Sequence, residues 1–118
     1  MKNILLTTLL LITLNASAQT VSGIPLEDIN TEYIEMTISD KLFSSKLSVS
    51  VDFGQPTKVL GSAGETYIKG DNGKAMEFNS IAHALNFMAS YGYKLEETYT
   101  VQVRDDLEVV HYVMRRER

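Results

Sequence analysis

Residues 80–103, SIAHALNFMASYGYKLEETYTVQV, change from a helical pattern to a strand pattern at one glycine. Four apolar residues before that glycine share the spacing i, i+3, i+4 and i+7 of one helical face: Ile81, Ala84, Leu85 and Met88. Asn79 or Ser80 can cap the first turn, and Gly92 stands where helices commonly end in the left-handed conformation. Apolar and polar residues alternate after Gly92, as in a half-buried strand. The segment therefore predicts a helix followed directly by a β-strand.

The strand after Gly92 is expected to form a hairpin with the residues that follow it. Its apolar positions alternate with polar ones and are expected to face the core: Tyr93, Leu95, Tyr99, Val101 and Val103. Glu97 breaks this alternation, which a β-bulge or a place at the sheet margin would explain. Residues 104–106 form the turn, and residues 109–114 return as a strand that is apolar on both faces. A strand with two apolar faces is typically central in its sheet.

Two more strands are predicted upstream, at residues 32–38 and 47–53. The second has the clearest alternation in the chain, with four apolar residues on one face: Leu47, Val49, Val51 and Phe53. A period of two with one polar face indicates a half-buried antiparallel strand. Residues 19–31 are rich in turn formers such as Gly23 and Pro25, so we expect a flexible, exposed leader there.

The segment between the second strand and the helix, residues 54–73, is the least regular part of the chain and holds five of its seven glycines. Short extended pieces are expected at residues 58–60 and 66–69, and residues 75–78 are expected to pair with the second piece as a small hairpin. The sequence Gly-Asp-Asn-Gly at residues 70–73 predicts the turn between them, because Asn and Gly tolerate positive φ.

The predicted order of elements is strand, strand, irregular insert, helix, strand and strand. A single amphipathic helix needs one sheet face to cover. We therefore expect an α+β fold in which an antiparallel sheet of about four strands (ββ-insert-αββ) carries one helix on one face. Residues 32–118 are expected to form this single domain.

Three motifs mark the C-terminal part of the chain: Ala84-Leu85-Asn86, Gly92-Tyr93, and His111-Tyr112 through Arg115-Arg116. With them, the chain resembles a family of small exported bacterial proteins, of the Bacteroides type and of unknown function. Members of that family carry an Ala-Leu-Asn helix, a Gly-aromatic turn and a final strand with a basic end. They often have Trp where this chain has Tyr93. The resemblance covers the C-terminal part well and the front half loosely; it implies the α+β fold and brings no activity.

Residues 1–18 predict a bacterial export signal. Lys2 precedes an apolar run at residues 4–14, and a small-x-small sequence follows at residues 16–18. The run is shorter than the roughly 20 apolar residues of a membrane-spanning helix, and no Cys follows it that could be acylated. We expect cleavage near Ala18 and a mature protein in the periplasm or secreted, with no stable membrane insertion.

Composition limits the classes of partner and of chemistry. The full chain has a net charge of −4, and loss of Lys2 reduces its 11 basic residues to 10 against 15 acidic ones, a net charge of −5. An acidic domain repels phosphate backbones, so nucleic acid is not an expected partner. The chain has no cysteine, which excludes disulfides, thiolate metal sites and thiol catalysis.

A catalytic or metal site would have to form around His83 or His111, the two histidines of the chain. Such a site needs convergent carboxylates. His83 has no Asp or Glu three or four residues away, and His111 lies between apolar and aromatic neighbours in a predicted strand. We expect both to be structural, and we expect no catalytic residue, metal or cofactor. A small envelope hydrolase that uses either histidine with Asp52 or Glu97 is the enzymatic alternative.

Four tyrosines form the candidate binding surface: Tyr67, Tyr91, Tyr93 and Tyr99. The last three lie close to the predicted helix–strand junction, and we expect Tyr67 near them. Exposed tyrosines bind peptides or sugars by stacking and hydrogen bonding. In the alternative interpretation, which we favour, they close the edge between helix and sheet with their phenol tips in water.

These patterns favour a non-catalytic binding or interaction module of the bacterial envelope, with a protein, peptide or glycan as partner. An open sheet edge accepts an extra strand, so a homo-oligomer joined through such an edge is one alternative for the assembly. The hydrolase described above and a purely structural envelope component stay open as alternatives for the function.

Overall fold

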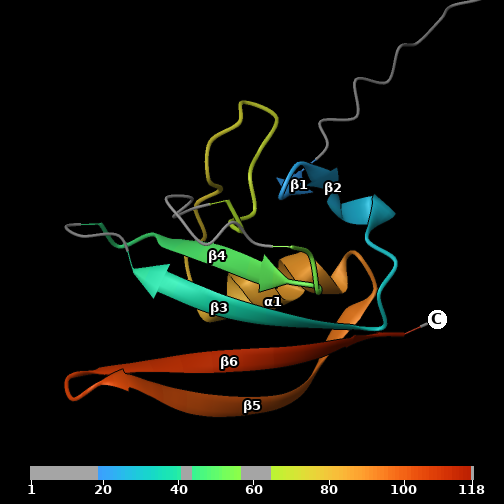
Figure 1. Cartoon of the computed structure of the whole chain (residues 1–118). Coiled ribbons are helices and arrows are strands. Elements are labelled where there is room, and N and C mark those ends of the chain that lie inside the picture. The colour runs from blue at the N-terminus through green and yellow to red at the C-terminus, as the bar shows by residue number, and fades with distance from the viewer. Residues whose placement is uncertain (1–18, 41–43, 57–64, 118) are drawn as a thin grey trace, which may run out of the picture.

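The computed structural model describes residues 19–40, 44–56 and 65–117. The predicted signal at residues 1–18 and the extended piece expected at residues 58–60 lie outside the described residues. Figure 1 shows the arrangement of the elements, which are β1 Thr20–Val21, β2 Ile24–Pro25, the 3-10 helix η1 Leu26–Asp28, β3 Tyr33–Asp40, β4 Leu47–Asp52, α1 Ile81–Ala89, β5 Tyr93–Arg104 and β6 Leu107–Arg116. The structure confirms the predicted α+β fold with an antiparallel sheet and a helix on one face.

The main sheet has four antiparallel strands in the order β4-β3-β6-β5. β3 pairs with β4 on one side, where Glu35 lies opposite Asp52. On its other side β3 pairs with β6, where Thr37 lies opposite His111. The strand β6 is therefore central, as its two apolar faces predicted, and β5 forms an edge of the sheet.

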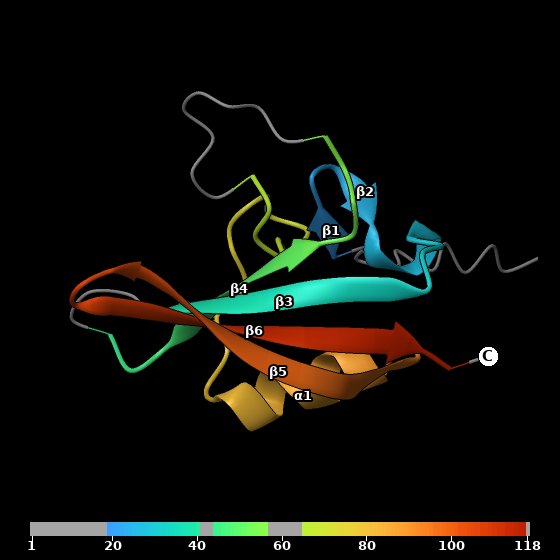
Figure 2. The same ribbon diagram turned by 60° about the horizontal axis from the view of Figure 1, so that its bottom comes forward.

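The helix α1 covers one face of the sheet (Figure 2). Within the described residues no α-helix covers the other face, which we call the open face. It begins after Ser80, whose hydroxyl accepts a hydrogen bond from the backbone N–H of His83 at 3.1 Å. Ala84 and Met88 of the predicted stripe are buried. Gly92, after the helix, has a φ of +89°, the left-handed conformation that the sequence predicted. Within the described residues, no helix is long and apolar enough to span a membrane.

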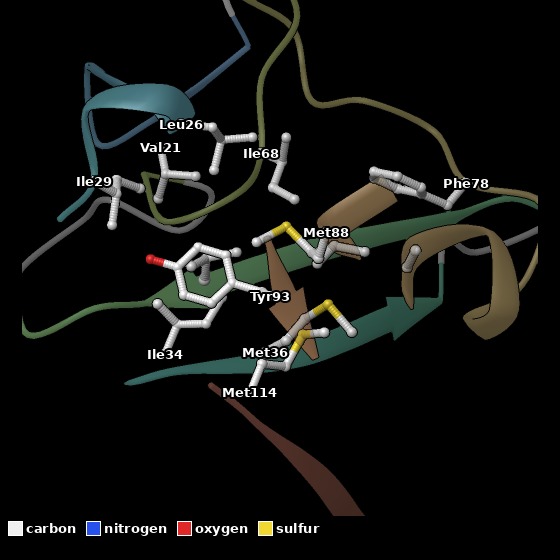
Figure 3. Packing of buried hydrophobic residues seen from close by; sticks show 13 residues of the cluster. Val21, Leu26, Ile29, Ile34, Met36, Ile68, Phe78, Met88, Tyr93 and Met114 are labelled. Carbon is white, nitrogen blue, oxygen red and sulfur yellow. The ribbon is translucent and has the colours of Figure 1, made fainter. Parts of the chain in front are cut away.

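The hydrophobic core lies between the sheet, the helix and the N-terminal segment (Figure 3). Its members come from all of these parts: Val21, Leu26, Ile29, Ile34, Met36, Val49, Val51, Ile68, Phe78, Ala84, Met88, Tyr93 and Met114. Burial of apolar surface contributes roughly 25 cal/mol per Å². Because the chain has no cysteine, this burial and the backbone hydrogen bonds hold the domain together without covalent cross-links.

The insert before the helix extends the sheet beyond β4. Ile68 donates a backbone hydrogen bond to Val49 of β4 at 2.8 Å, and Met76 donates one back to Ile68 at 2.8 Å. The predicted hairpin between residues 66–69 and 75–78 is therefore confirmed. Its turn is closed by the N–H of Gly73, which donates to the carbonyl of Gly70 at 3.0 Å.

Residues 19–31 are not the exposed leader that the sequence predicted. Val21 and Leu26 are 0% and 1% exposed. Thr20 exchanges two backbone hydrogen bonds with Lys69 of the insert, at 2.9 and 2.8 Å. The turn-forming residues in this segment shape the tight turn between β1 and β2, and the apolar residues around that turn reach the core.

β5 carries a β-bulge, one of the two predicted explanations for the irregular position of Glu97. The pairing with β6 shifts between Leu95 and Glu97, so that the strand has one extra residue there. A second shift lies between Gln102 and Arg104. The regular part of β5 is therefore the stretch between these two irregularities.

The predicted burial of the apolar face of β5 is wrong except at its first residue. Tyr93 is 1% exposed, but every residue from Lys94 to Arg104 is exposed. The nine residues of α1 span about 13 Å, whereas the 12 residues of β5 span about 40 Å. The helix is therefore too short to cover the whole strand. The bulge also changes the face: Leu95 lies opposite Met114 of the core, whereas Tyr99 lies opposite His111 on the other face. The apolar residues after the bulge therefore point away from the helix. The β5–β6 hairpin also extends past the last pair between β6 and β3, His111 with Thr37.

Replacement of Leu26 by Ala should lower the free energy of unfolding by about 2–5 kcal/mol, the usual cost of such a core truncation. The matched control is Ile24→Ala, because Ile24 lies in the same segment but is 38% exposed. Its expected cost is below about 1 kcal/mol. Urea denaturation followed by circular dichroism measures both. Equal, small losses in the two variants would contradict the packing of this segment into the core.

Candidate functional site on the open sheet face

Side chains from three strands meet on the open face of the sheet: Glu35 of β3, His111 of β6 and Tyr99 of β5. The register brings them together, because Thr37 and Tyr99 both lie opposite His111. Glu35 is two residues from Thr37 and therefore points to the same face. The three side chains form a cluster, which we call the open-face cluster.

The contacts within the open-face cluster are short. The hydroxyl of Tyr99 donates to Glu35 Oε1 at 2.6 Å, and its ring stacks on His111 with centroids 4.7 Å apart and planes 11° apart. His111 Nδ1 lies 3.4 Å from Glu35 Oε2, but this buried nitrogen has no hydrogen-bond partner of acceptable geometry among the described residues. We therefore interpret the His111–Glu35 contact as electrostatic, and it becomes an ion pair when the imidazole is protonated.

A depression of about 240 Å³ adjoins the cluster on the same face. Its lining residues are Glu35, Thr37, Ser50, Asp52, Thr66 and His111. Glu35 and Asp52 lie directly opposite one another on neighbouring strands, an arrangement in which like charges destabilise a sheet. The hydroxyls of Ser50 and Thr66 are hydrogen-bonded at 2.5 Å. The depression therefore combines two carboxylates with several hydroxyl groups.

The surroundings of Tyr99 raise the pKa of its phenol. The largest cause is the hydrogen bond that the phenol donates to Glu35, and desolvation and the negative charges of Glu35 and Asp52 act in the same direction. Each of these effects favours the neutral phenol over the phenolate. Tyr99 is therefore held as a hydrogen-bond donor.

His83 is not part of this site. It lies at the start of α1, and its Nδ1 accepts a hydrogen bond from the backbone N–H of Asn79 at 3.0 Å. Its ring contacts Phe78 edge-on, with centroids 5.1 Å apart. This is the structural role that the sequence predicted for it.

His111 lies in the sheet, as predicted, but it has a carboxylate neighbour that the sequence analysis missed. That neighbour is Glu35 and not Asp52 or Glu97. Glu35 lies on the polar face of a predicted strand, which is a weak signal by itself. Only the pairing of β3 with β6 brings it to His111, and strand pairing between distant segments is not written in a local pattern.

The four predicted tyrosines do not share one surface. Tyr93 belongs to the core, and Tyr91 is half-buried with its hydroxyl donating to Gln19 at 2.8 Å. Tyr67 lies in the insert beyond β4, whereas Tyr99 lies on the open face. Closure of the edge between helix and sheet therefore describes Tyr91 and Tyr93, whose hydroxyls donate to Gln19 and to the carbonyl oxygen of Thr31.

A larger depression, of about 770 Å³, lies where β5 begins and β6 ends, and two ion pairs occupy it. Arg115 contacts Glu32 at 3.0 Å, and Lys94 contacts Glu117 at 2.8 Å. The hydrogen bond to Glu32 raises the pKa of Arg115. Exposed pairs of this kind contribute little to stability, and they leave less unbalanced charge for a ligand than the open face does.

Neither a metal centre nor a relationship to known proteins helps to assign the site. Within residues 19–40, 44–56 and 65–117, no group of three His, Cys, Asp or Glu side chains is placed to hold a metal ion. No protein-family model, curated protein or solved structure matches this chain. The resemblance to small exported bacterial proteins therefore stays a prediction, and the function has to be argued from the site.

Glu35→Gln should lower the pKa of Tyr99, because it removes the carboxylate that favours the neutral phenol. Tyr91 is the internal control, since burial and the charge of Glu27 raise its pKa and the substitution touches neither. An alkaline titration, followed through the NMR shifts of the tyrosine ring carbons, measures the pKa values of Tyr99 and Tyr91 in one sample. An unchanged Tyr99 pKa would contradict the hydrogen bond to Glu35.

The raised pKa also sets the sign of a pH effect on stability. The stabilisation from Tyr99 is fully present below the ordinary tyrosine pKa of about 10. It is lost as the pH rises through the higher pKa of the folded protein, since the unfolded chain then binds fewer protons. Tyr99→Phe should therefore flatten the loss of stability in this alkaline range, as measured by urea denaturation at several pH values.

Proposed function

We propose that this protein is a non-catalytic binding module, exported to the bacterial envelope, whose open sheet face binds a basic side chain of a peptide. The observation that carries the proposal is the depression next to the open-face cluster, in which Glu35 and Asp52 lie directly opposite one another. Both carboxylates face the same open side of the sheet.

Charge favours a cationic ligand at this position. Two carboxylates on directly opposed residues repel each other, and a guanidinium or ammonium group between them would relieve that repulsion. Charge-assisted hydrogen bonds of this type are among the stronger polar contacts in proteins. The net charge of −4 attracts basic ligands over a longer range, an effect that salt screens.

Size favours one side chain over a complete small molecule. The depression measures about 240 Å³, below the roughly 300–1,000 Å³ of typical small-molecule pockets. The stacked rings of Tyr99 and His111 lie beside it, and Tyr99 is 40% exposed. Such rings pack well against the aliphatic stem of Lys or Arg and against a peptide backbone.

Export is the second part of the proposal, and the sequence of residues 1–18 supports it. A positive residue, a short apolar run and a small-x-small exit are the three parts of a secretory signal. The absence of cysteine from the chain fits a domain that is exported without a lipid anchor on a cysteine.

A small hydrolase is the second candidate, because the Glu35 carboxylate lies 3.4 Å from His111 and a carboxylate can orient a catalytic histidine. Ser50 and Thr66 are the hydroxyl nucleophiles available in the depression. They are bonded to one another, and no described hydrogen bond joins either of them to His111. This lack of coupling between base and nucleophile favours binding over hydrolysis.

Asp52→Asn should weaken the binding of a basic peptide about tenfold, the expected loss for one charge-assisted contact. The substitution keeps the oxygen that accepts a hydrogen bond from the N–H of Gly54 at 2.9 Å, so the local backbone is retained. The probes are the capped tripeptides Ala-Arg-Ala and Ala-Glu-Ala, titrated into the labelled protein. Amide NMR shifts of the lining residues should saturate with the first peptide and not with the second.

Glu108→Gln is the matched control for this experiment, because it removes one carboxylate from the exposed hairpin outside the depression. If peptide affinity falls equally in both variants, the loss is caused by the change in net charge and not by a contact with Asp52. If a neutral oligosaccharide gives saturable amide shifts and the Arg peptide gives none, the ligand is a glycan and not a basic peptide. Ester hydrolysis that disappears in His111→Ala would favour the hydrolase instead.

The export proposal predicts the N-terminus of the mature protein. Mass spectrometry of the protein from envelope or culture-medium fractions should give a chain that begins at Gln19 or within a residue or two of it. An intact chain that still contains residues 1–18, found only in the cytoplasmic fraction, would contradict export.

A further inference from the structure

We propose that two copies of this protein join through β5, so that their main sheets continue into one another as a twofold-symmetric dimer. The occupant of the β5 edge is thus a second copy of the same chain. This inference goes beyond the peptide-binding proposal and does not depend on it. The depression is lined by residues of β3, β4, β6 and the insert, whereas the dimer uses the outer edge of β5.

The first argument is the free edge itself. β5 is the last strand in the order β4-β3-β6-β5, and no strand of the described chain pairs with its outer side. The other end of the sheet is covered, because the insert is hydrogen-bonded to β4. β5 has 12 residues, about twice the usual strand length. Such an edge offers a long row of backbone N–H and C=O groups to another strand.

The second argument is the uncovered apolar surface in the middle of β5. Tyr99 and Val101 are each 40% exposed and Val103 is 56% exposed. Proteins usually protect an edge strand with charges, proline or bulges. In β5 the two bulges lie near its ends, and residues 98–102 contain neither a charge nor a proline. The middle of the strand is therefore unprotected.

The third argument is charge complementarity in one particular register. In a symmetric antiparallel pair centred on Thr100, residues equally distant from Thr100 in opposite directions lie opposite one another. Tyr99 then meets Val101 of the second copy, and Glu96, the extra residue of the first bulge, comes next to its Arg104, just past the second bulge. Twofold symmetry repeats each pair. Arg104 is available for this contact, because it takes part in none of the ion pairs of the described chain.

The neighbouring symmetric registers are worse. A pair centred on Tyr99 places Lys94 opposite Arg104, and a pair centred on Val101 places Thr98 opposite Arg104 and so loses the pair with Glu96. Like charges directly opposite destabilise a sheet. If one copy of β5 slid along the other by a single residue, Tyr99 and Val101 of the two copies would no longer lie on the same face of the joined sheet. The charge pattern therefore selects the register centred on Thr100.

The unmodified protein provides the first test. Sedimentation equilibrium over a wide range of concentration should show a reversible monomer–dimer equilibrium. Hydrogen exchange at residues 98–102 should slow as the dimer fraction rises, because their outward amides become paired. A monomer at every concentration would overturn the proposal, and so would a dimer in which these amides exchange as fast as in the monomer.

A charge exchange tests the register. Glu96→Arg and Arg104→Glu each create two like-charge pairs in a homodimer, so each variant alone should dimerise at least about tenfold more weakly. In an equimolar mixture, the heterodimer regains two unlike pairs and should form about as tightly as the original dimer. Circular dichroism checks that both variants fold. Weak association in the mixture as well would overturn the register.

Val101→Lys tests the edge against the hairpin surface in general. It places a charge in the middle of the interface and should abolish dimerisation. Val110→Lys is the matched control, because Val110 is 39% exposed on the neighbouring strand β6, away from the edge. It should leave dimerisation unchanged. Equal loss in both variants, or in neither, would assign the association to another surface.

Discussion

The antiparallel pairing of β3 with β6 is the contact on which the rest of the molecule depends. It joins the hairpin of β3 and β4 to the hairpin of β5 and β6. Its register sets Glu35 beside His111 and, through β6, beside Tyr99. It also decides which strand is left outside, because β6 in the centre forces β5 to the edge. The polar site on the open face and the unprotected edge are two results of one alignment.

Local patterns predict the elements well, because each element depends mainly on neighbours in the sequence. The spacing of the helical stripe, the cap at Ser80 and the glycine at position 92 define the helix without knowledge of the fold. The two apolar faces of residues 109–114 place that strand in the centre of the sheet for the same reason. The structure places this strand between β3 and β5, although Met114 is its one buried residue.

The features that the sequence does not predict arise from contacts between distant segments. Val21 and Leu26 stand among turn formers, and they become core residues only because the insert pairs with β1 through Lys69. His111 gains Glu35 through a pairing that no local pattern encodes. The alternation in β5 predicts a strand correctly, but the bulge between Leu95 and Glu97 turns the apolar side chains after it to the open face, away from the helix.

The central place of β6 also affects when the main sheet can form during synthesis. The strand is made last among the described elements, yet it has to enter between β3 and β5. Before it is made, β3 pairs only with β4, and β4 with the insert, while β5 has no strand to pair with. The sheet therefore cannot close until β6 has left the ribosome, and pairing across such a long separation is intrinsically slow. A chain with this strand order completes its main sheet only after its last strand has been made.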